Sequence, residues 1–216
     1  METKSKKAAG SSSKASKTQQ RKDDPRIFTY EQLKEMTNEF DKLIGEGQYA
    51  KVYKGTLNNK DIAVKIYMDE YKMYWENERE ALINFDHPNI VSLLGIYHDD
   101  NRFCLILNYV PRNLEEVLEG NLGWPYAHKI LLQLAAAIGE ISAKNFVVGD
   151  IKPDNVLIDE EYNVCLCDFG SAKIGGKDLP TVNPYYAAKE ILLKGSGTPA
   201  ADVYSFGVIL LQIIMK

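Results

Sequence analysis

The sequence predicts an α+β fold, in which a small five-stranded antiparallel sheet with one helix precedes a mainly helical part. Short apolar runs separated by turn signals fill the first half of the chain, as expected for strands. Two of these runs, residues 90–97 and 102–110, flank a charged turn and form a predicted hairpin. Between Ala127 and Ile141 the apolar residues recur at steps of four, three, four and three, which is the period of an amphipathic helix.

The remaining elements of the first half follow from the same kind of pattern. A glycine-rich turn between two strands at residues 43–55 predicts another hairpin, and residues 61–67 predict the strand that follows it. Helical spacing of apolar residues predicts a short helix at residues 31–40 and a longer one at residues 71–86. Together with the second hairpin, these strands complete the five-stranded sheet.

The composition is that of an ordinary globular protein, with 45% hydrophobic and 26% charged residues among 216. No run of about 18 apolar residues predicts a membrane span, and the N-terminus lacks the apolar stretch of a signal peptide. Cys104, Cys165 and Cys167 are too few and too irregularly spaced for a disulfide framework or a four-ligand zinc site. We therefore expect a reducing, cytoplasmic location, with any contact to the plasma membrane made through partners.

Charge is divided unevenly along the chain. Residues 1–22 carry seven Lys or Arg and one Glu, a net charge of +6, so the remainder carries −10 within the total of −4. Residues 1–27 hold almost no large apolar side chains and are predicted to be a disordered basic tail. Such a tail can touch nucleic acid or an anionic membrane, although a solvated tail is the simpler interpretation. The acidic remainder argues against a nucleic-acid-binding fold, and we expect no nucleic-acid partner.

Four polar residues between 147 and 170 form the pattern on which the functional prediction depends. Asp150 is followed by Lys152 and Asn155, and a short apolar run leads to Asp168. One carboxylate can accept a proton from a hydroxyl, and a lysine can steady a phosphate. An amide oxygen and a second carboxylate can hold magnesium, a hard cation that prefers oxygen. Phosphoryl transfer requires these parts, because the protein's task there is positioning and charge neutralisation.

Two features upstream fit the same chemistry. Gly45 and Gly47 lie in a turn between two strands, where glycine lets backbone amides approach phosphate oxygens closely. Lys65 alternates with apolar residues on its strand and needs a partner if it is buried, although lysines are also common on edge strands. The helix at residues 71–86 is expected to supply that partner. Glu78 falls on its apolar side, among other charged residues whose simplest interpretation is a solvated face.

These motifs resemble those of protein kinases. The D-x-K-x-x-N pattern that begins at Asp150 and the D-F-G that begins at Asp168 are similar to the kinase catalytic loop and magnesium loop. The A-V-K that ends at Lys65 is similar to the kinase V-A-I-K, and Glu78 matches the position of the helical glutamate that pairs with this lysine. Residues 171–193 resemble an activation segment.

The resemblance covers about residues 28–216, with the motifs in the same order. F-T-Y at residues 28–30 and D-V-Y-S-F-G at residues 202–207 look like plant receptor-like kinases and their cytoplasmic relatives, and Lys152 looks like a serine/threonine kinase. The implied fold is bilobal and protein-kinase-like. Its boundaries are a small lobe at about 41–107, a hinge at about 108–112 and a partial, mainly helical large lobe at about 113–216, within a kinase-like domain of residues 28–216.

The resemblance also implies a role for each site residue. Asp150 is expected to orient the substrate hydroxyl, and Lys152 to stabilise the transferring phosphoryl group. Asn155 and Asp168 are expected to hold Mg²⁺. The residues implied in binding ATP are Gly45 and Gly47 over its phosphates, Lys65 fixed by Glu78, Val52, Ala63 and Leu157 around adenine, and Asn108 and Val110 in the hinge.

The sequence departs from the kinase pattern in several places. Ala50 replaces the third glycine of the glycine-rich loop, and Lys189 replaces the proline of A-P-E. Val148 and Gly149 stand where kinases carry His and Arg, which removes the arginine that would pair with a phosphorylated activation segment. The last predicted helix is apolar nearly all round, which marks a buried helix, and the resemblance implies that its Asp202 tethers the catalytic loop.

Because the chain stops right after this helix, the large lobe is expected to be incomplete, which leaves one flank with Leu210, Leu211, Ile213 and Ile214 without a cover. We expect either that the chain self-associates or that a membrane receptor or partner kinase covers the helix. Two functions therefore remain open. The first is a serine/threonine protein kinase that transfers the γ-phosphoryl group of ATP to a protein substrate in intracellular signalling. The second is a truncated, pseudokinase-like module that binds nucleotide or a partner kinase and acts as a scaffold or decoy without catalysis.

Overall fold

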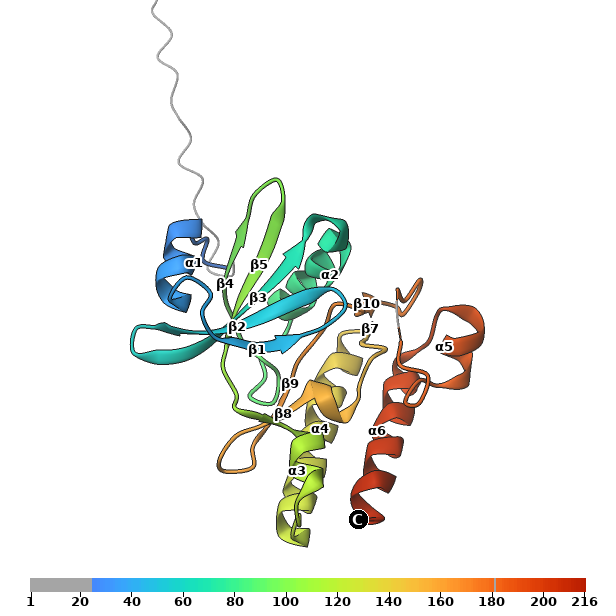
Figure 1. The fold of residues 1–216 in the computed structure, drawn as a ribbon. Helices are drawn as coiled ribbons and strands as arrows, with labels where there is room; N and C mark the ends of the chain where they lie inside the picture. The colour runs from blue at the N-terminus through green and yellow to red at the C-terminus, as the bar shows by residue number, and fades with distance from the viewer. Residues whose placement is uncertain (1–24, 181) are drawn as a thin grey trace, which may run out of the picture.

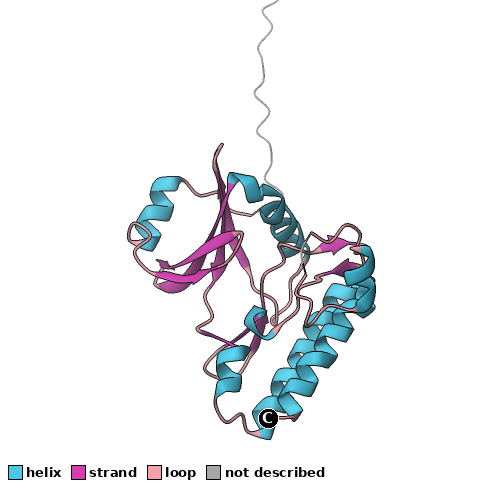
Figure 2. Ribbon diagram, turned by 45° about the vertical axis from the view of Figure 1, so that its right-hand side comes forward, coloured by secondary structure: helices cyan, strands magenta, loops and turns pink. Residues whose placement is uncertain are grey.

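The computed structural model describes residues 25–180 and 182–216, which form two connected parts (Figure 1). A five-stranded sheet with helix α2 makes up the first part, and helices α3, α4 and α6 dominate the second. Figure 2 shows the same division from another side. The predicted α+β, bilobal arrangement is confirmed. Residues 1–24 of the predicted N-terminal tail lie outside the described residues.

The first part contains the elements that build the sheet and its covering helices. In chain order these are α1 (Tyr30–Thr37), β1 (Leu43–Glu46), β2 (Ala50–Leu57), β3 (Lys60–Met68), the 3₁₀ helix η1 (Asp69–Tyr71), α2 (Lys72–Asn84), β4 (Leu93–His98) and β5 (Arg102–Asn108). The strands lie in the order β1-β2-β3-β5-β4, and each neighbouring pair is antiparallel, as predicted. The turn between β2 and β3 uses Asn58 and Asn59 at φ 50 and 61°, the left-handed geometry that tight hairpins require.

The second part alternates helices with short strand pairs. Its elements are β6 (Arg112–Asn113), α3 (Leu114–Glu119), α4 (Trp124–Ala143), β7 (Phe146–Val147), the 3₁₀ helix η2 (Pro153–Asn155), β8 (Val156–Ile158), β9 (Val164–Leu166), β10 (Lys173–Ile174), α5 (Lys189–Lys194) and α6 (Pro199–Ile214). The apolar stripe predicted from Ala127 to Ile141 is buried along α4, in the core that both parts share. Among the described residues, no helix combines the length and apolar character needed to cross a membrane.

Helix α1 is shorter than the sequence predicted. The Thr29 side chain accepts a hydrogen bond from the backbone N–H of Gln32, whose own side chain accepts one from the Thr29 N–H, and this capping box begins the helix. The helix was expected to reach Phe40, but it ends at Thr37. The next residue, Asn38, adopts φ 51°, and the left-handed backbone continues through Phe40 at 59°.

Alternation along β3 decides which side chains face the cleft between the two parts. Ile62 and Val64 are buried on the outer face, in a cluster with Phe28 and Leu33 beneath α1. Tyr67, like Leu105 of β5, belongs to the other cluster, into which α2 packs. Because successive strand residues point to opposite faces, Lys65 lies on the same face as Tyr67. The strand therefore delivers its lysine to the α2 side of the sheet.

Helix α6 is covered on one side only, in agreement with the expectation that one flank lacks a cover, although Ile213, which was expected on that flank, is buried. Ile209 and Ile213 are buried, whereas Leu211 and Ile214 are 57% and 56% exposed. The reason is that α4 packs against one face of α6 only. The expectation that a partner covers this helix stays a prediction.

This one-sided burial predicts different stabilities for two substitutions in α6. Ile209→Ala is expected to lower the free energy of unfolding by about 2–5 kcal/mol, because it leaves a cavity in the core. Leu211→Ala, two positions away and exposed, is expected to change it by less than about 0.5 kcal/mol. Urea denaturation followed by circular dichroism measures both. Equal losses in the two variants would contradict the burial described here.

Candidate active site

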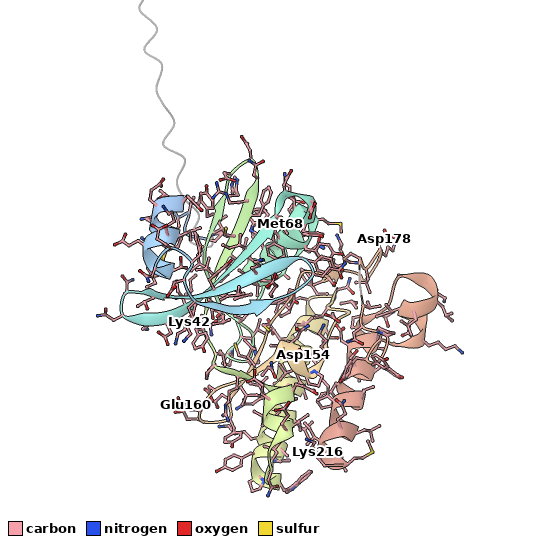
Figure 3. The ribbon with its side chains drawn as sticks, viewed as in Figure 1. Lys42, Met68, Asp154, Glu160, Asp178 and Lys216 are labelled. Atoms are coloured by element: carbon pink, nitrogen blue, oxygen red, sulfur yellow. The ribbon has the colours of Figure 1, made fainter. Side chains whose placement is uncertain are left out.

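A cleft of about 940 Å³ lies between the sheet and the helical part. Every residue that the sequence singled out for catalysis, nucleotide binding or metal binding lies on its walls: Gly45, Gly47, Val52, Ala63, Lys65, Glu78, Asn108, Val110, Asp150, Lys152, Asn155, Leu157 and Asp168. Asp154, which also lines the cleft, marks the position of the loop around η2 in Figure 3. The fold thus gathers residues from β1, β2, β3, α2, β5, η2 and β8, and from the loops that follow β1, β5, β7 and β9, into one place.

Lys65 lies between two carboxylates. Its Nζ atom is 2.7 Å from Oε2 of Glu78 and 2.9 Å from Oδ1 of Asp168. Burial lowers the pKa of Lys65, but the charges of Asp168 and Glu78 outweigh it and raise this pKa well above its usual value. Enclosure raises the pKa of Asp168, yet the ammonium of Lys65 more than compensates and leaves it below its usual value. The lysine is therefore a fixed cation and Asp168 a fixed anion.

Glu78 is held by a second residue of β3. Its side chain is completely buried, and its Oε2 atom also accepts a hydrogen bond from the hydroxyl of Tyr67. Burial raises the pKa of Glu78 more than the charge of Lys65 lowers it. A buried carboxylate needs both partners, because an unpaired charge in the interior is very costly. Two residues on one face of β3 thus fix the position of α2.

Asp150 is the centre of a separate set of hydrogen bonds. Its Oδ2 atom accepts one from Lys152 Nζ at 2.9 Å and one from Asn155 Nδ2 at 3.2 Å. Its Oδ1 atom accepts one from the backbone N–H of Asn183 at 3.2 Å. Burial raises the pKa of Asp150, and Lys152 offsets part of this effect. The carboxylate is oriented by three donors and borders the cleft, where a substrate hydroxyl can reach it.

Asn155 and Asp168 provide oxygen atoms that fit as ligands of a magnesium ion. Asn155 donates through Nδ2 to the carbonyl of Asp150 at 2.8 Å, while its Oδ1 atom accepts no hydrogen bond from the described residues. Oδ2 of Asp168 is likewise without a hydrogen bond to the described residues. An amide oxygen and an ionised carboxylate are ligands that Mg²⁺ prefers, with water and phosphate oxygens as the usual remaining ligands.

The chain's comparison with known proteins agrees with this geometry. A family model described as the protein kinase domain matches residues 38–216. The chain belongs to the protein kinase family. A probable receptor-like protein kinase of Arabidopsis thaliana, At4g10390, is 34% identical over 86% of this chain and 62% of its own length. The probable serine/threonine-protein kinase PBL16, from the same plant, is 34% identical over 87% of this chain and 53% of its own length.

A probable leucine-rich-repeat receptor-like serine/threonine-protein kinase of that plant, At1g07550, is 36% identical over 89% of this chain and 24% of its own length. The chain therefore spans less than two thirds of the length of these three relatives. The expected resemblance to plant receptor-like kinases and their cytoplasmic relatives is confirmed.

In this kinase domain the loop that carries Asp150 is held by an acid from α6. The carboxylate of Asp202 accepts hydrogen bonds from the backbone N–H groups of Val148 at 2.8 Å and Gly149 at 2.9 Å. Burial raises the pKa of Asp202 to about 6, although these two backbone hydrogen bonds act in the opposite direction. Gly149 adopts φ +77°, which glycine reaches without steric cost. The residue in place of the kinase arginine therefore suits the backbone of the loop.

Sequence reasoning missed Tyr67, Asn77 and Asn183. Tyr67 could have been found, because it lies two residues after Lys65 and strand alternation places both on one face. Asn77 and Asn183 gave no comparable signal. Their contacts with Gly170 and Asp150 depend on how segments far apart in the sequence pack against each other.

The left-handed backbone at Gly149 predicts the effect of adding a side chain there. Gly149→Ala is expected to destabilise the fold by about 1–2 kcal/mol, since a Cβ atom would also lie 3.3 Å from the side chain of Leu179. Gly139→Ala is the matched control, because Gly139 lies within α4 with open space around it and the change is expected to stabilise by about 1 kcal/mol. Thermal unfolding measures both, and a destabilised Gly139→Ala beside a neutral Gly149→Ala would refute this assignment.

Proposed function

We propose that this kinase domain is an active serine/threonine protein kinase that transfers the γ-phosphoryl group of ATP to a hydroxyl of a protein. One observation carries the proposal: an oriented carboxylate, Asp150, and a fixed cation, Lys65, line the same cleft as Asn155 and Asp168, the proposed metal ligands. Phosphoryl transfer depends on placing these charges rather than on covalent chemistry by the protein.

Each residue then has a role that its contacts support. Lys65, held by Glu78, binds phosphate oxygens of ATP, and the backbone of Gly45 and Gly47 covers them. Asp150 accepts a hydrogen bond from the substrate hydroxyl, orients it and takes its proton. Lys152, whose Nζ atom lies 2.9 Å from Asp150, neutralises charge on the transferring phosphoryl group.

Asn155 and Asp168 would hold Mg²⁺, which when bound supplies charge neutralisation at the phosphates. Val52, Ala63 and Leu157 line the part of the cleft proposed for adenine, between the sheet and the second part. Val110 lines the same cleft beyond β5, and its backbone groups make no hydrogen bond with the described residues. The backbone groups of Val110, together with the backbone of Asn108, are proposed to bind the edge of the adenine ring.

The serine/threonine specificity is supported by Lys152 and by the resemblance to two relatives that are named as serine/threonine-protein kinases. A second function, nucleotide binding without catalysis, is favoured by a different observation. The catalytic loop carries Val148 and Gly149 ahead of Asp150, so no cation from these positions can pair with a phosphorylated activation segment. The two functions make opposite predictions for phosphoryl transfer.

Phosphoryl transfer is expected to depend on Asp150. With labelled ATP, Mg²⁺ and a generic protein acceptor, the parent chain is expected to label serine or threonine. Asp150→Asn is expected to lower the rate by about a hundredfold or more, since the amide cannot accept the hydroxyl proton. Phosphoamino-acid analysis identifies the labelled residue. A parent rate no higher than that of Asp150→Asn would favour the second function.

Magnesium is expected to strengthen nucleotide binding through Asp168. ATP with Mg²⁺ is expected to raise the melting temperature of the parent chain more than ATP alone, because a ligand bound to the folded state stabilises it. Asp168→Asn is expected to remove the additional, magnesium-dependent shift, because a neutral amide is a poorer ligand for this cation. Equal shifts with and without Mg²⁺ in the parent chain would argue against the proposed metal site.

A further inference from the structure

Helix α2 contacts the segment that carries Asp168 through a residue beside Glu78. Asn77 is 6% exposed, and both ends of its amide are used. Its Nδ2 atom donates to the carbonyl of Gly170 at 2.8 Å, and its Oδ1 atom accepts from Nζ of Lys173 at 2.8 Å. This contact is distinct from the ion pair of Glu78 with Lys65, because it joins α2 directly to the residues after Asp168.

The two contacts close a ring. Glu78 binds Lys65, Lys65 binds Asp168, and Asp168 is two residues from Gly170. Gly170 returns to α2 through Asn77, the residue next to Glu78. In such a ring, Asp168 cannot move away from Lys65 unless α2 moves with it or the amide contact breaks. The ion pairs of Lys65 hold the side chain of Asp168 near α2. The hydrogen bond from Asn77 holds the backbone after Asp168, at Gly170.

The backbone conformation around Asp168 needs stabilising contacts from its neighbours. Asp168 adopts φ +62°, a left-handed conformation that an L-residue other than glycine adopts at an energetic cost. The buried Gly170 carbonyl needs a donor, and Asn77 supplies it. The ring of Tyr74, one turn earlier on α2, would lie 3.4 Å from a Cβ atom added to Gly170, so the helix also packs closely against this residue. Without Asn77 the carbonyl would stay buried without a partner, which favours another backbone conformation.

We propose that Asn77 is a positioning residue that holds Asp168 in its metal-binding conformation by tying the Asp168–Lys173 segment to helix α2. The inference rests on the proposed function, because it assigns Asp168 to the metal. Through Lys173 the same amide also contacts the start of the activation segment. The position of α2 and the conformation of this segment are therefore coupled by one side chain.

The test compares Asn77→Leu with Asn84→Leu in the whole chain. Leucine has about the size of asparagine and makes no hydrogen bonds. Asn84 is a matched control on the same helix, because it is exposed and, among the described residues, its side-chain amide bonds only to the carbonyl of Glu80 within α2. Hydrogen–deuterium exchange without nucleotide is measured at residues 168–173. Binding of ATP is measured by thermal shift and by titration, with and without Mg²⁺.

Asn77→Leu is expected to exchange faster at residues 168–173 and to bind ATP with Mg²⁺ at least about fivefold more weakly, while binding of ATP alone is unchanged. Asn84→Leu is expected to match the parent chain in both measurements. A purely structural role for Asn77 would lower the melting temperature without changing the dependence on Mg²⁺, and that result would overturn the proposal. Unchanged exchange at residues 168–173 would overturn it as well.

A second variant keeps the test decisive if Asn77→Leu does not fold. Lys173→Met removes the other partner of the amide while keeping an unbranched apolar side chain, and it is expected to change exchange and Mg²⁺ dependence in the same direction. Wild-type behaviour of Lys173→Met would then overturn the proposal. If ATP produces no shift in the parent chain, the proposed function fails, and the exchange measurement alone decides whether Asn77 holds the segment.

Discussion

The position of one largely buried cation, Lys65, is the constraint on which the rest of the structure depends. An ammonium in this environment is stable only beside negative charge, and it has two partners, Glu78 at 2.7 Å and Asp168 at 2.9 Å. Each of the three groups comes from a different element: strand β3, helix α2 and the segment after β9. Because removing Lys65 would leave the fully buried Glu78 without its cation, the lysine fixes the three elements relative to one another. These three residues line one wall of the cleft, so the position of that wall depends on their contacts.

The opposite wall depends on a different kind of interaction, a carboxylate that accepts hydrogen bonds from backbone N–H groups. Asp202 of α6 holds the backbone of Val148 and Gly149, and so fixes the loop that presents Asp150. These contacts join residues more than 50 positions apart in the chain. The same helix contributes Ile209 to the core, so the packing of α6 and the placement of Asp150 are physically linked. A loop of this kind keeps its shape because its buried N–H groups have a partner in the core.

Local sequence signals were sufficient for most of the elements, and the resemblance to protein kinases supplied the candidate site residues. The five strands and the amphipathic α4 follow from apolar periodicity, and the turns follow from glycine, asparagine and aspartate. Lys65, Asp150, Asn155 and Asp168 were proposed because the motifs around them resemble those of protein kinases. The ends of the elements were predicted less well. Helix α1 stops at Thr37 because Asn38 adopts a left-handed backbone, and the periodicity of apolar residues, which predicted a helix as far as Phe40, carries no signal for that conformation.

By itself the sequence determined which residues are chemically capable and in what order they occur, because residue type and spacing are local properties. The tertiary structure alone decided which of them meet. Asn77 reaches Gly170, Tyr67 reaches Glu78, and the backbone of Asn183 reaches Asp150 only after separate segments pack together. It also decided which residues of α6 lie on the covered face, since the burial of each residue of an apolar helix depends on its neighbours and not on the composition of the helix.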